Sequence, residues 1–183
     1  MEHFYNEIHG WFEYENFMID MVSRLPNNAK IVEIGAWKGR STSFISVECI
    51  NSGKNIEYFV VDTWLGSNEH EHIHDGEIST LYDVFLKNTE RIKDFIKPMK
   101  MTSVEASKHF KDGSLDYVYI DGSHEYEDVL DDIKHWYPKV KRGGIISGDD
   151  YLWNPVERAV NESFGILGVE FKIEGNEWYY EKL

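Results

Sequence analysis

Apolar residues near the start of the chain recur every three or four positions. The repeating residues are Trp11, Tyr14, Met18, Met21, Val22 and Leu25. Residues at this spacing share one face of a helix, so the pattern predicts an amphipathic helix that ends near Pro26-Asn-Asn28. We expect residues 1–28 to form a helical segment packed on a unit of residues 29–183, with the chain forming one domain overall.

After that segment, short apolar runs alternate with helical patterns. Strand-like runs occupy residues 30–35, 57–62, 97–101, 115–121 and 145–148, with helical stripes at about 40–50, 78–92 and 129–140. Such runs are typical of strands buried on both faces, and helical connections make these strands parallel. Residues 169–183 alternate around Glu174-Gly-Asn176, which predicts a β-hairpin. The pattern therefore predicts an α/β fold: a mostly parallel sheet with helices on both faces, one reversed edge strand and a C-terminal hairpin.

The charge balance argues against several classes of partner. Asp and Glu number 33 against 19 Lys and Arg, for a net charge of −14. Nucleic-acid binding needs a basic surface, and an anionic membrane repels such a chain, so we expect neither as a partner. No apolar run approaches the roughly 18 residues that span a bilayer. The N-terminus lacks the features of a secretory signal, and Cys49 has no second cysteine to pair with, so we expect a cytoplasmic protein. The sequence leaves open whether copies associate as a homo-oligomer.

The segment Ile31–Thr42 predicts a strand, a glycine turn and then a helix. In open α/β sheets this arrangement presents backbone N–H groups to a nucleotide-like ligand beyond the carboxyl end of the strand. The spacing is acidic-x-Gly-x-x-x-Gly and not Gly-x-Gly-x-x-Gly, which favours S-adenosylmethionine (SAM) over a dinucleotide. We expect the cofactor-binding residues here to be Glu33, Gly35, Ala36, Gly39, Ser41 and Thr42. An ordinary strand–helix turn is the alternative interpretation.

Each glycine and hydroxyl of this turn has an expected task. Gly35 lets the backbone approach the cofactor, because a Cβ there would fill the gap, and Gly39 allows the tight turn into the helix. Ser41 and Thr42 can donate hydrogen bonds to a carboxylate near the start of that helix. Asp62 ends the second strand, 23 residues after Gly39, where an acid accepts hydrogen bonds from both ribose hydroxyls. Thr63 follows it and joins the predicted cofactor-binding set, and a turn-capping role is the alternative for Asp62.

Carboxylates also close the fourth and fifth predicted strands. Asp121 follows one strand, and Asp149 and Asp150 follow the next. Adjacent strand ends would bring the three carboxylates together, where their repulsion would force at least one to hold a proton unless a cation bound them. Oxygen-only ligands favour Mg²⁺, Mn²⁺ or Ca²⁺ over zinc, with three caps or solvated acids as the alternative. His124, three residues after Asp121, is the candidate proton acceptor, and adenine contact or simple packing is its alternative.

Three histidines alternate with acids in Asn68–Asp75. Zinc ligands are normally spaced on a fixed scaffold, so this pattern favours a solvated active-site loop over a zinc site. The sequence leaves open whether residues 66–76 form a lid. Trp64, His70 and Trp153 are candidates for the wall of an acceptor pocket, with core packing as the alternative for both tryptophans.

Four segments carry a resemblance to a known family. They are Val32–Ser41, Val61–Ser67, Tyr119–Tyr126 and Trp136–Tyr151. Together they resemble class I SAM-dependent methyltransferases, and within that class the small domain of macrocin-type sugar O-methyltransferases and cephalosporin-hydroxylase-like proteins. The resemblance implies a Rossmann-like seven-strand sheet whose last strand is antiparallel.

The resemblance also implies roles for individual residues. It assigns Glu33, Gly35 and Ser41 to the methionine end of SAM, Asp62 to the ribose, and the segment Met101-Thr-Ser103 to adenine. Metal-dependent relatives, including catechol O-methyltransferases, use acids that match Asp121, Asp149 and Asp150. In the catechol enzymes a lysine base stands at the position of His124, and some sugar enzymes have an acid at the position of Ser123.

These observations predict a SAM-dependent O-methyltransferase that acts on a hydroxyl of a small acceptor, a sugar or another vicinal-hydroxyl compound. We expect SAM and Mg²⁺ (or Mn²⁺ or Ca²⁺) as cofactors, and Asp121 and His124 as the catalytic residues. The alternatives are a non-catalytic SAM-binding module or partner in a biosynthetic assembly, a methyltransferase that needs no metal, and an NAD-linked reductase, which the missing Gly-x-Gly-x-x-Gly disfavours.

Overall fold

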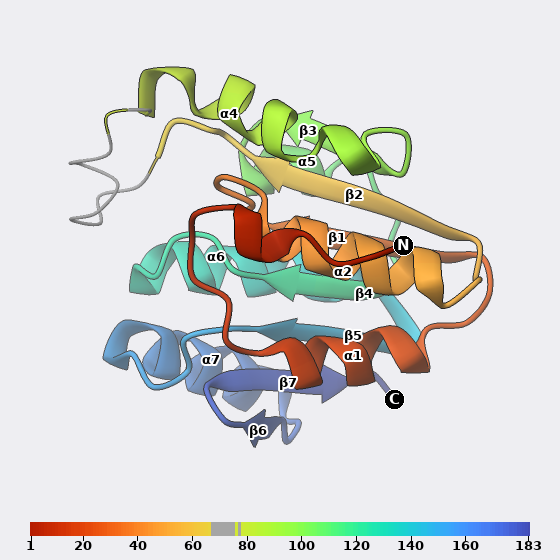
Figure 1. Cartoon of the computed structure of the whole chain (residues 1–183). Helices are drawn as coiled ribbons and strands as arrows, with labels where there is room; N and C mark the ends of the chain where they lie inside the picture. Colours follow the sequence, from red (N-terminus) through yellow and green to blue (C-terminus); the bar gives the residue numbers. More distant parts are fainter. Residues whose placement is uncertain (67–75, 77) are drawn as a thin grey trace.

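A computed structural model describes residues 1–66, 76 and 78–183 and places one seven-stranded sheet at the centre of the protein (Figure 1). The strand order is β3-β2-β1-β4-β5-β7-β6. The strands are β1 (Ala29–Ile34), β2 (Ile56–Asp62), β3 (Ile96–Lys100), β4 (Leu115–Ile120), β5 (Val140–Gly148), β6 (Lys172–Glu174) and β7 (Glu177–Glu181). Strands β1 to β5 pair in parallel, whereas β7 is antiparallel to both β5 and β6.

Helices lie on both faces of this sheet, with α1 and α2 on one face and α6 and α7 on the other (Figure 1). The α-helices are α1 (Glu15–Arg24), α2 (Arg40–Asn51), α4 (Leu81–Asn88), α5 (Ser103–Ser107), α6 (Tyr126–Trp136) and α7 (Asn154–Leu167). Short 3₁₀ turns are η1 (Tyr5–Glu7), η2 (Ile78–Thr80), η3 (Glu90–Ile92) and η4 (Tyr137–Lys139). Within the described part of the chain, no helix is long and apolar enough to cross a membrane.

The predicted α/β fold is confirmed, and its differences in detail have local causes. The reversed strand β7 is not at the edge, because β6 pairs outside it. Strand β5 begins at Val140 and not at Ile145, because Val140 already pairs with Leu115 of β4, and the register shifts before Ile145 pairs with Tyr117. A Cβ on Gly144 would lie 3.0 Å from the β4 backbone. The stripe over residues 78–92 is split into α4 and two 3₁₀ turns. The predicted helical stripes leave out α5, which is only five residues long, and also α7, which has 14 residues.

The N-terminal segment shares a core with one face of the sheet. Met18 and Met21 on α1 are fully buried, and Phe12, before that helix, is also buried in the same cluster as the β1 residue Ile31. Trp11 differs from the prediction, because it precedes α1 and is 55% exposed. The chain from Gly10 to Tyr14 therefore runs along the sheet at the ends of its central strands, where it reaches the cleft described below.

The tips of β1 and β4 approach each other more closely than a side chain would allow. Gly35 has a φ of +87°, and a Cβ built on it would lie 1.9 Å from the backbone oxygen of Asp121. The backbone of Asp121, directly after β4, therefore requires glycine at this position, and the approach of a cofactor to Gly35 stays a prediction. Gly39, with a φ of 90°, is the N-cap residue directly before α2, and a Cβ on it would lie 2.8 Å from the Thr89 side chain.

We expect Gly35→Ala to destabilise the fold by at least about 2 kcal/mol more than Gly113→Ala. Both glycines have a positive φ, but no atom lies within 4 Å of a Cβ at Gly113. The control therefore carries only the backbone strain, whereas Gly35→Ala adds the collision with β4. Chemical denaturation of both variants measures the difference. Equal losses of unfolding free energy in the two variants would contradict the close approach of β1 and β4.

Candidate active site

A cleft of about 1360 Å³ opens at the carboxyl ends of the central strands. Ligand pockets commonly measure roughly 300–1000 Å³, so this cleft has room for a cofactor and a second molecule. The predicted site residues that line it are Gly35, Ala36, Ser41, Asp62, Thr63, Ser103, Asp121, His124, Asp149 and Asp150. Glu33, Gly39 and Thr42 are not among the described lining residues. The structure thus brings most of the predicted set to one cleft.

Glu33 is completely buried beneath the cleft and is held by three hydroxyl groups. Ser41 donates to Glu33 Oε1 at 2.5 Å, and Thr42 and Tyr58 donate to Oε2 at 2.6 and 2.7 Å. Burial raises the pKa of Glu33 to about 7, although the three hydroxyl donors oppose the shift. The carboxylate that accepts the hydrogen bonds from Ser41 and Thr42 is therefore that of Glu33. This network fixes β1, β2 and α2 beside the turn, and direct contact of Glu33, Gly39 or Thr42 with a cofactor stays a prediction.

Asp62 lies at the cleft and also holds the turn after β1. Its Oδ2 accepts hydrogen bonds from the N–H groups of Ala36 and Trp37 at 2.8 and 2.9 Å, and its Oδ1 accepts from Trp64 N–H at 2.7 Å. A carboxylate has about four acceptor positions, so these bonds leave one, on Oδ1. Asp62 therefore supports the turn, as the alternative interpretation expected. Its described contacts leave an acceptor position for one ribose hydroxyl, whereas the prediction was for two.

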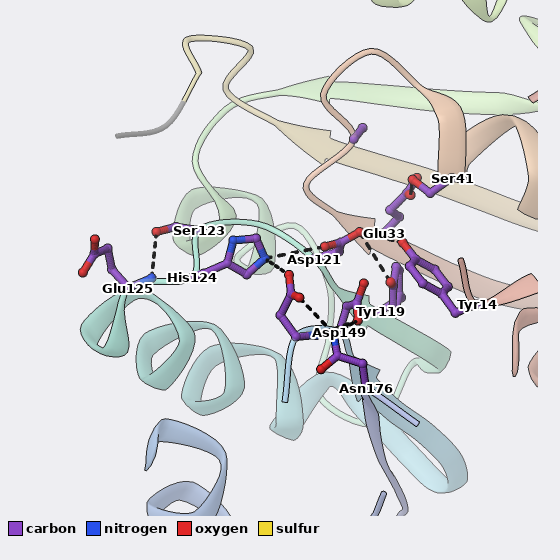
Figure 2. Close-up of polar contacts among 12 residues, drawn as sticks. Tyr14, Glu33, Ser41, Tyr119, Asp121, Ser123, His124, Glu125, Asp149 and Asn176 are labelled. Carbon is purple, nitrogen blue, oxygen red and sulfur yellow. Dashed lines mark hydrogen bonds and ion pairs between the residues drawn. The ribbon is translucent and has the colours of Figure 1, made fainter. Parts of the chain in front are cut away.

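The carboxylates at the tips of β4 and β5 converge with His124 (Figure 2). One ligand atom from each of Asp121, His124 and Asp150 lies within 4.8 Å of the others. His124 Nε2 is 2.8 Å from Asp150 Oδ2 and 3.9 Å from Asp121 Oδ1. This trio differs from the predicted metal set, because His124 joins it. Asp149 lies alongside, where its Oδ1 accepts from Asp150 N–H at 2.6 Å.

The electrostatics of these groups follow from burial and mutual repulsion. Burial and the charge of Asp121 raise the pKa of Asp149 to about 8. Burial also raises the pKa of Asp121, against hydrogen bonds from His124 and Tyr14. Burial opposes ionisation of Asp150 as well, but hydrogen bonds from His124 and Asn176 outweigh it and lower the pKa of this carboxyl. The cluster therefore carries carboxylates that compete for protons, as the sequence predicts.

Residues from distant parts of the chain hold this cluster in place. Tyr14 donates its hydroxyl to Asp121 Oδ2 at 2.8 Å (Figure 2). Asn176, in the hairpin turn, donates to Asp149 Oδ1 at 3.2 Å and to Asp150 Oδ1 at 2.9 Å. Asp150 has a φ of 55°, an uncommon backbone conformation that is often found at functional sites. Sequence reasoning missed Tyr14 and Asn176, because neither lies near the acids in the chain.

Ser103 and Asp132, which also line the cleft, belong to a second polar network. Trp136 Nε1 donates to Ser103 Oγ at 2.7 Å, and the Ser103 hydroxyl donates to Asp132 Oδ1. Burial raises the pKa of Asp132 to about 7, against the hydrogen bond from Ser103. Asp128, Asp131 and Asp132 of α6 all line the cleft and were missed. Their spacing of three and four residues places them on one helix face, which could have revealed them.

The structure distinguishes between the tryptophans that are candidates for the wall of the acceptor pocket. Trp64 is 2% exposed and packs against Tyr82 and Phe85, so the core alternative is correct for it. Trp153 lines the cleft and is 50% exposed. His70 and the histidine-rich loop lie outside the described residues, so their roles stay predictions.

The sequence matches the family described as "Methyltransferase domain" over residues 32–151, more than half of the chain. The chain therefore belongs to this family, and the predicted resemblance to class I SAM-dependent methyltransferases is confirmed. Two curated proteins are similar in sequence. Protein y4gI of Sinorhizobium fredii is 30% identical over 145 residues, which cover 79% of this chain and 15% of that protein. Protein R132 of Acanthamoeba polyphaga mimivirus is 26% identical over 136 residues, which cover 72% of this chain and 57% of that protein. The chain thus spans only part of each relative.

Solved structures share the fold. The O-methyltransferase NovP has a TM-score of 0.68 at 19% identity, covering 92% of this chain and 78% of that chain. CalS11, described as a TDP-rhamnose 3′-O-methyltransferase, has a TM-score of 0.60 at 13% identity, covering 91% and 76%. A precorrin-8w decarboxylase has a TM-score of 0.63 at 15% identity, covering 95% and 91%. These likenesses establish the architecture, and the reaction has to be argued from the site.

We expect Glu33→Gln to flatten the dependence of stability on pH. The pKa of Glu33 is raised to about 7 in the folded protein from 4.5, so the unfolded chain binds fewer protons between these values. The stabilisation that protonated Glu33 gives the folded protein is complete below about pH 4.5 and is lost as pH rises through about 7. One group with this shift removes about 3 kcal/mol in total. Glutamine mimics the protonated acid and should avoid the loss.

The measurement is the free energy of unfolding of wild type and variant from acid to mildly alkaline pH. Glu157→Gln, on the exposed side of α7, is the matched control and should keep the wild-type slope. A Glu33→Gln variant with the same slope as wild type would contradict the burial of a titrating carboxyl.

Proposed function

We propose that this protein is a SAM-dependent O-methyltransferase that methylates a hydroxyl of a small acceptor, a sugar or another vicinal diol, with help from a divalent cation. The observation that carries the proposal is the convergence of Asp121, His124 and Asp150 within one cleft that also contains the turn after β1. A cofactor turn and a proton-accepting cluster in one cleft are what methyl transfer to a hydroxyl requires.

The cleft fits SAM at several points. The turn after β1 presents Gly35 and Ala36 to it, and Asp62 Oδ1 keeps one acceptor position for a ribose hydroxyl. Met101 to Ser103 line the part assigned to adenine by the family resemblance. When bound, SAM supplies a methyl group on a good leaving group, so orientation and electrostatics provide most of the catalysis.

The strand tips fit a divalent cation. Asp121 and Asp150 offer hard oxygen ligands, as Mg²⁺, Mn²⁺ and Ca²⁺ prefer, and Asp149 lies next to them. A bound cation lowers the pKa of a hydroxyl that it coordinates. The imidazole of His124 would widen the choice toward Mn²⁺ or Zn²⁺ if it were a ligand.

His124 is the proposed proton acceptor. Its Nε2 faces both carboxylates at the tips of β4 and β5 and lies in the cleft. Because Nε2 already donates to Asp150, the acceptor's hydroxyl proton would pass to the other ring nitrogen, Nδ1, when the acceptor oxygen is methylated. Asp150 stabilises the imidazolium that results, because it is already 2.8 Å away.

A non-catalytic SAM-binding module, acting alone or within a biosynthetic assembly, is the second candidate. A binding module would account for the turn and for Asp62. It would not account for the uncommon backbone conformation of Asp150 or for the hydroxyl and amide groups that orient the acids. We therefore favour the enzyme.

Removing one carboxylate should weaken cation binding. We expect Asp150→Asn to lower Mn²⁺ affinity at least about tenfold, measured by calorimetry with S-adenosylhomocysteine present. Asp112→Asn is the control, because the Asp112 side chain is 73% exposed and lies outside the cleft lining. His124→Ala separates the two roles of the imidazole: unchanged Mn²⁺ affinity supports a proton acceptor, and a matching loss supports a ligand. Wild-type Mn²⁺ affinity in Asp150→Asn would contradict the cation site.

Asp62→Ala should lower SAM affinity by on the order of 1.5–3 kcal/mol, the usual worth of hydrogen bonds to a charged group. The same change leaves three backbone N–H groups without their acceptor, so stability should also fall. Titration with SAM at a temperature where the variant is folded separates the two effects. Near-normal affinity of the folded variant would contradict the ribose assignment.

A further inference from the structure

The cleft carries far more negative charge than the proposed cation site uses. Among its described lining residues, nine are Asp or Glu, one is Arg and none is Lys. The arginine, Arg40, directs its guanidinium at the N-terminal segment, donating to the Ile8 carbonyl at 3.0 Å and to Asn6 Oδ1 at 3.2 Å. One divalent cation and the sulfonium of SAM together offset three charges. Even with Asp132 and Asp149 protonated, the carboxylates remain in excess.

Aromatic rings line the same cleft with much of their surface exposed. Trp11 is 55% exposed and Trp153 is 50% exposed. Trp11 stacks on Trp37 with ring centroids 5.0 Å apart and an angle of 16° between the planes. Trp153 lies beside His124, with 5.0 Å between their ring centroids. Flat apolar faces beside a polar cluster suit a ring that exposes one apolar face and polar groups at its edge.

The geometry points to the chemical class of the acceptor: a ring-bearing vicinal diol that is uncharged or cationic. This inference rests on the proposed function, since it concerns the second molecule in the same cleft. The ring packs on an exposed tryptophan face, and the diol reaches the acids at the strand tips. A phosphorylated or carboxylated acceptor is rejected, because its charge would enter a cleft of the same sign with no lysine to neutralise it among the described lining residues.

A matched set of three diols tests the charge rule directly. Catechol, dopamine and 3,4-dihydroxyphenylacetate share one ring and differ in charge. Their dissociation constants are measured by calorimetry on the full chain with S-adenosylhomocysteine and Mg²⁺ present. We expect the anionic diol to bind at least tenfold more weakly than catechol, and dopamine to bind at least as well as catechol. Because screening weakens repulsion, the gap should narrow as salt is added.

Two charge-reversal variants locate the effect. Asp131 is exposed and lines the cleft, whereas Glu127 is exposed on the same helix and is not among the lining residues. Asp131→Lys should raise the affinity for the anionic diol relative to catechol at least threefold, and Glu127→Lys should leave the ratio unchanged. An equal change of this affinity ratio in both variants would contradict a local effect of the charge in the cleft.

The tryptophan face is tested separately. Trp153→Ala should weaken all three diols at least fivefold without changing S-adenosylhomocysteine affinity, because Trp153 lies beside His124, and Trp153→Phe should restore most of the loss. The inference is overturned if the anionic diol binds as tightly as catechol, or if no diol binds while S-adenosylhomocysteine does. Failure to bind S-adenosylhomocysteine at all would count against the proposed function itself.

Discussion

The site depends on the close contact between the backbones of β1 and β4 at Gly35 and Asp121. The parallel pairing continues past the ends of the strands: Asp121 N–H donates to the Ile34 carbonyl of β1 at 2.8 Å, and Gly35 N–H donates to the Val61 carbonyl of β2 at 2.9 Å. Because no Cβ separates the two tips, the turn after β1 and the acids after β4 and β5 open into one cleft. A cofactor on the turn and an acceptor on the acids would then occupy adjoining positions, which is the arrangement that a direct transfer needs.

Polar groups around this contact are fixed before any ligand binds. Glu33 is locked by three hydroxyl donors beneath the turn, and Asp62 is held by three backbone N–H groups at its edge. Tyr14 brings the N-terminal segment to Asp121, so that segment is part of the site as well as of the core. Preorganised dipoles of this kind need little rearrangement when charge develops, which favours catalysis over simple binding.

The sequence predicted the sheet and the strand ends well, because buried parallel strands and helical stripes are local patterns. Asp62, Asp121, Asp149 and Asp150 were predicted at one cleft because each closes a strand. What escaped prediction depends on contacts between distant residues: Tyr14 and Asn176 on the acids, and Trp11 on Trp37. Glu33 shows the same limit. Its position in the motif was visible, but its burial under three hydroxyls was not.

We propose that methyl transfer in this cleft depends on a divalent cation bound at the strand tips. The most direct measurement is the release of S-adenosylhomocysteine from SAM across a panel of hydroxylated acceptors, with Mg²⁺ and with a chelator. We predict release that requires both an acceptor and the cation. Release that is equally fast in chelator would contradict the claim of cation assistance, and no release with any acceptor despite tight SAM binding would favour a binding module.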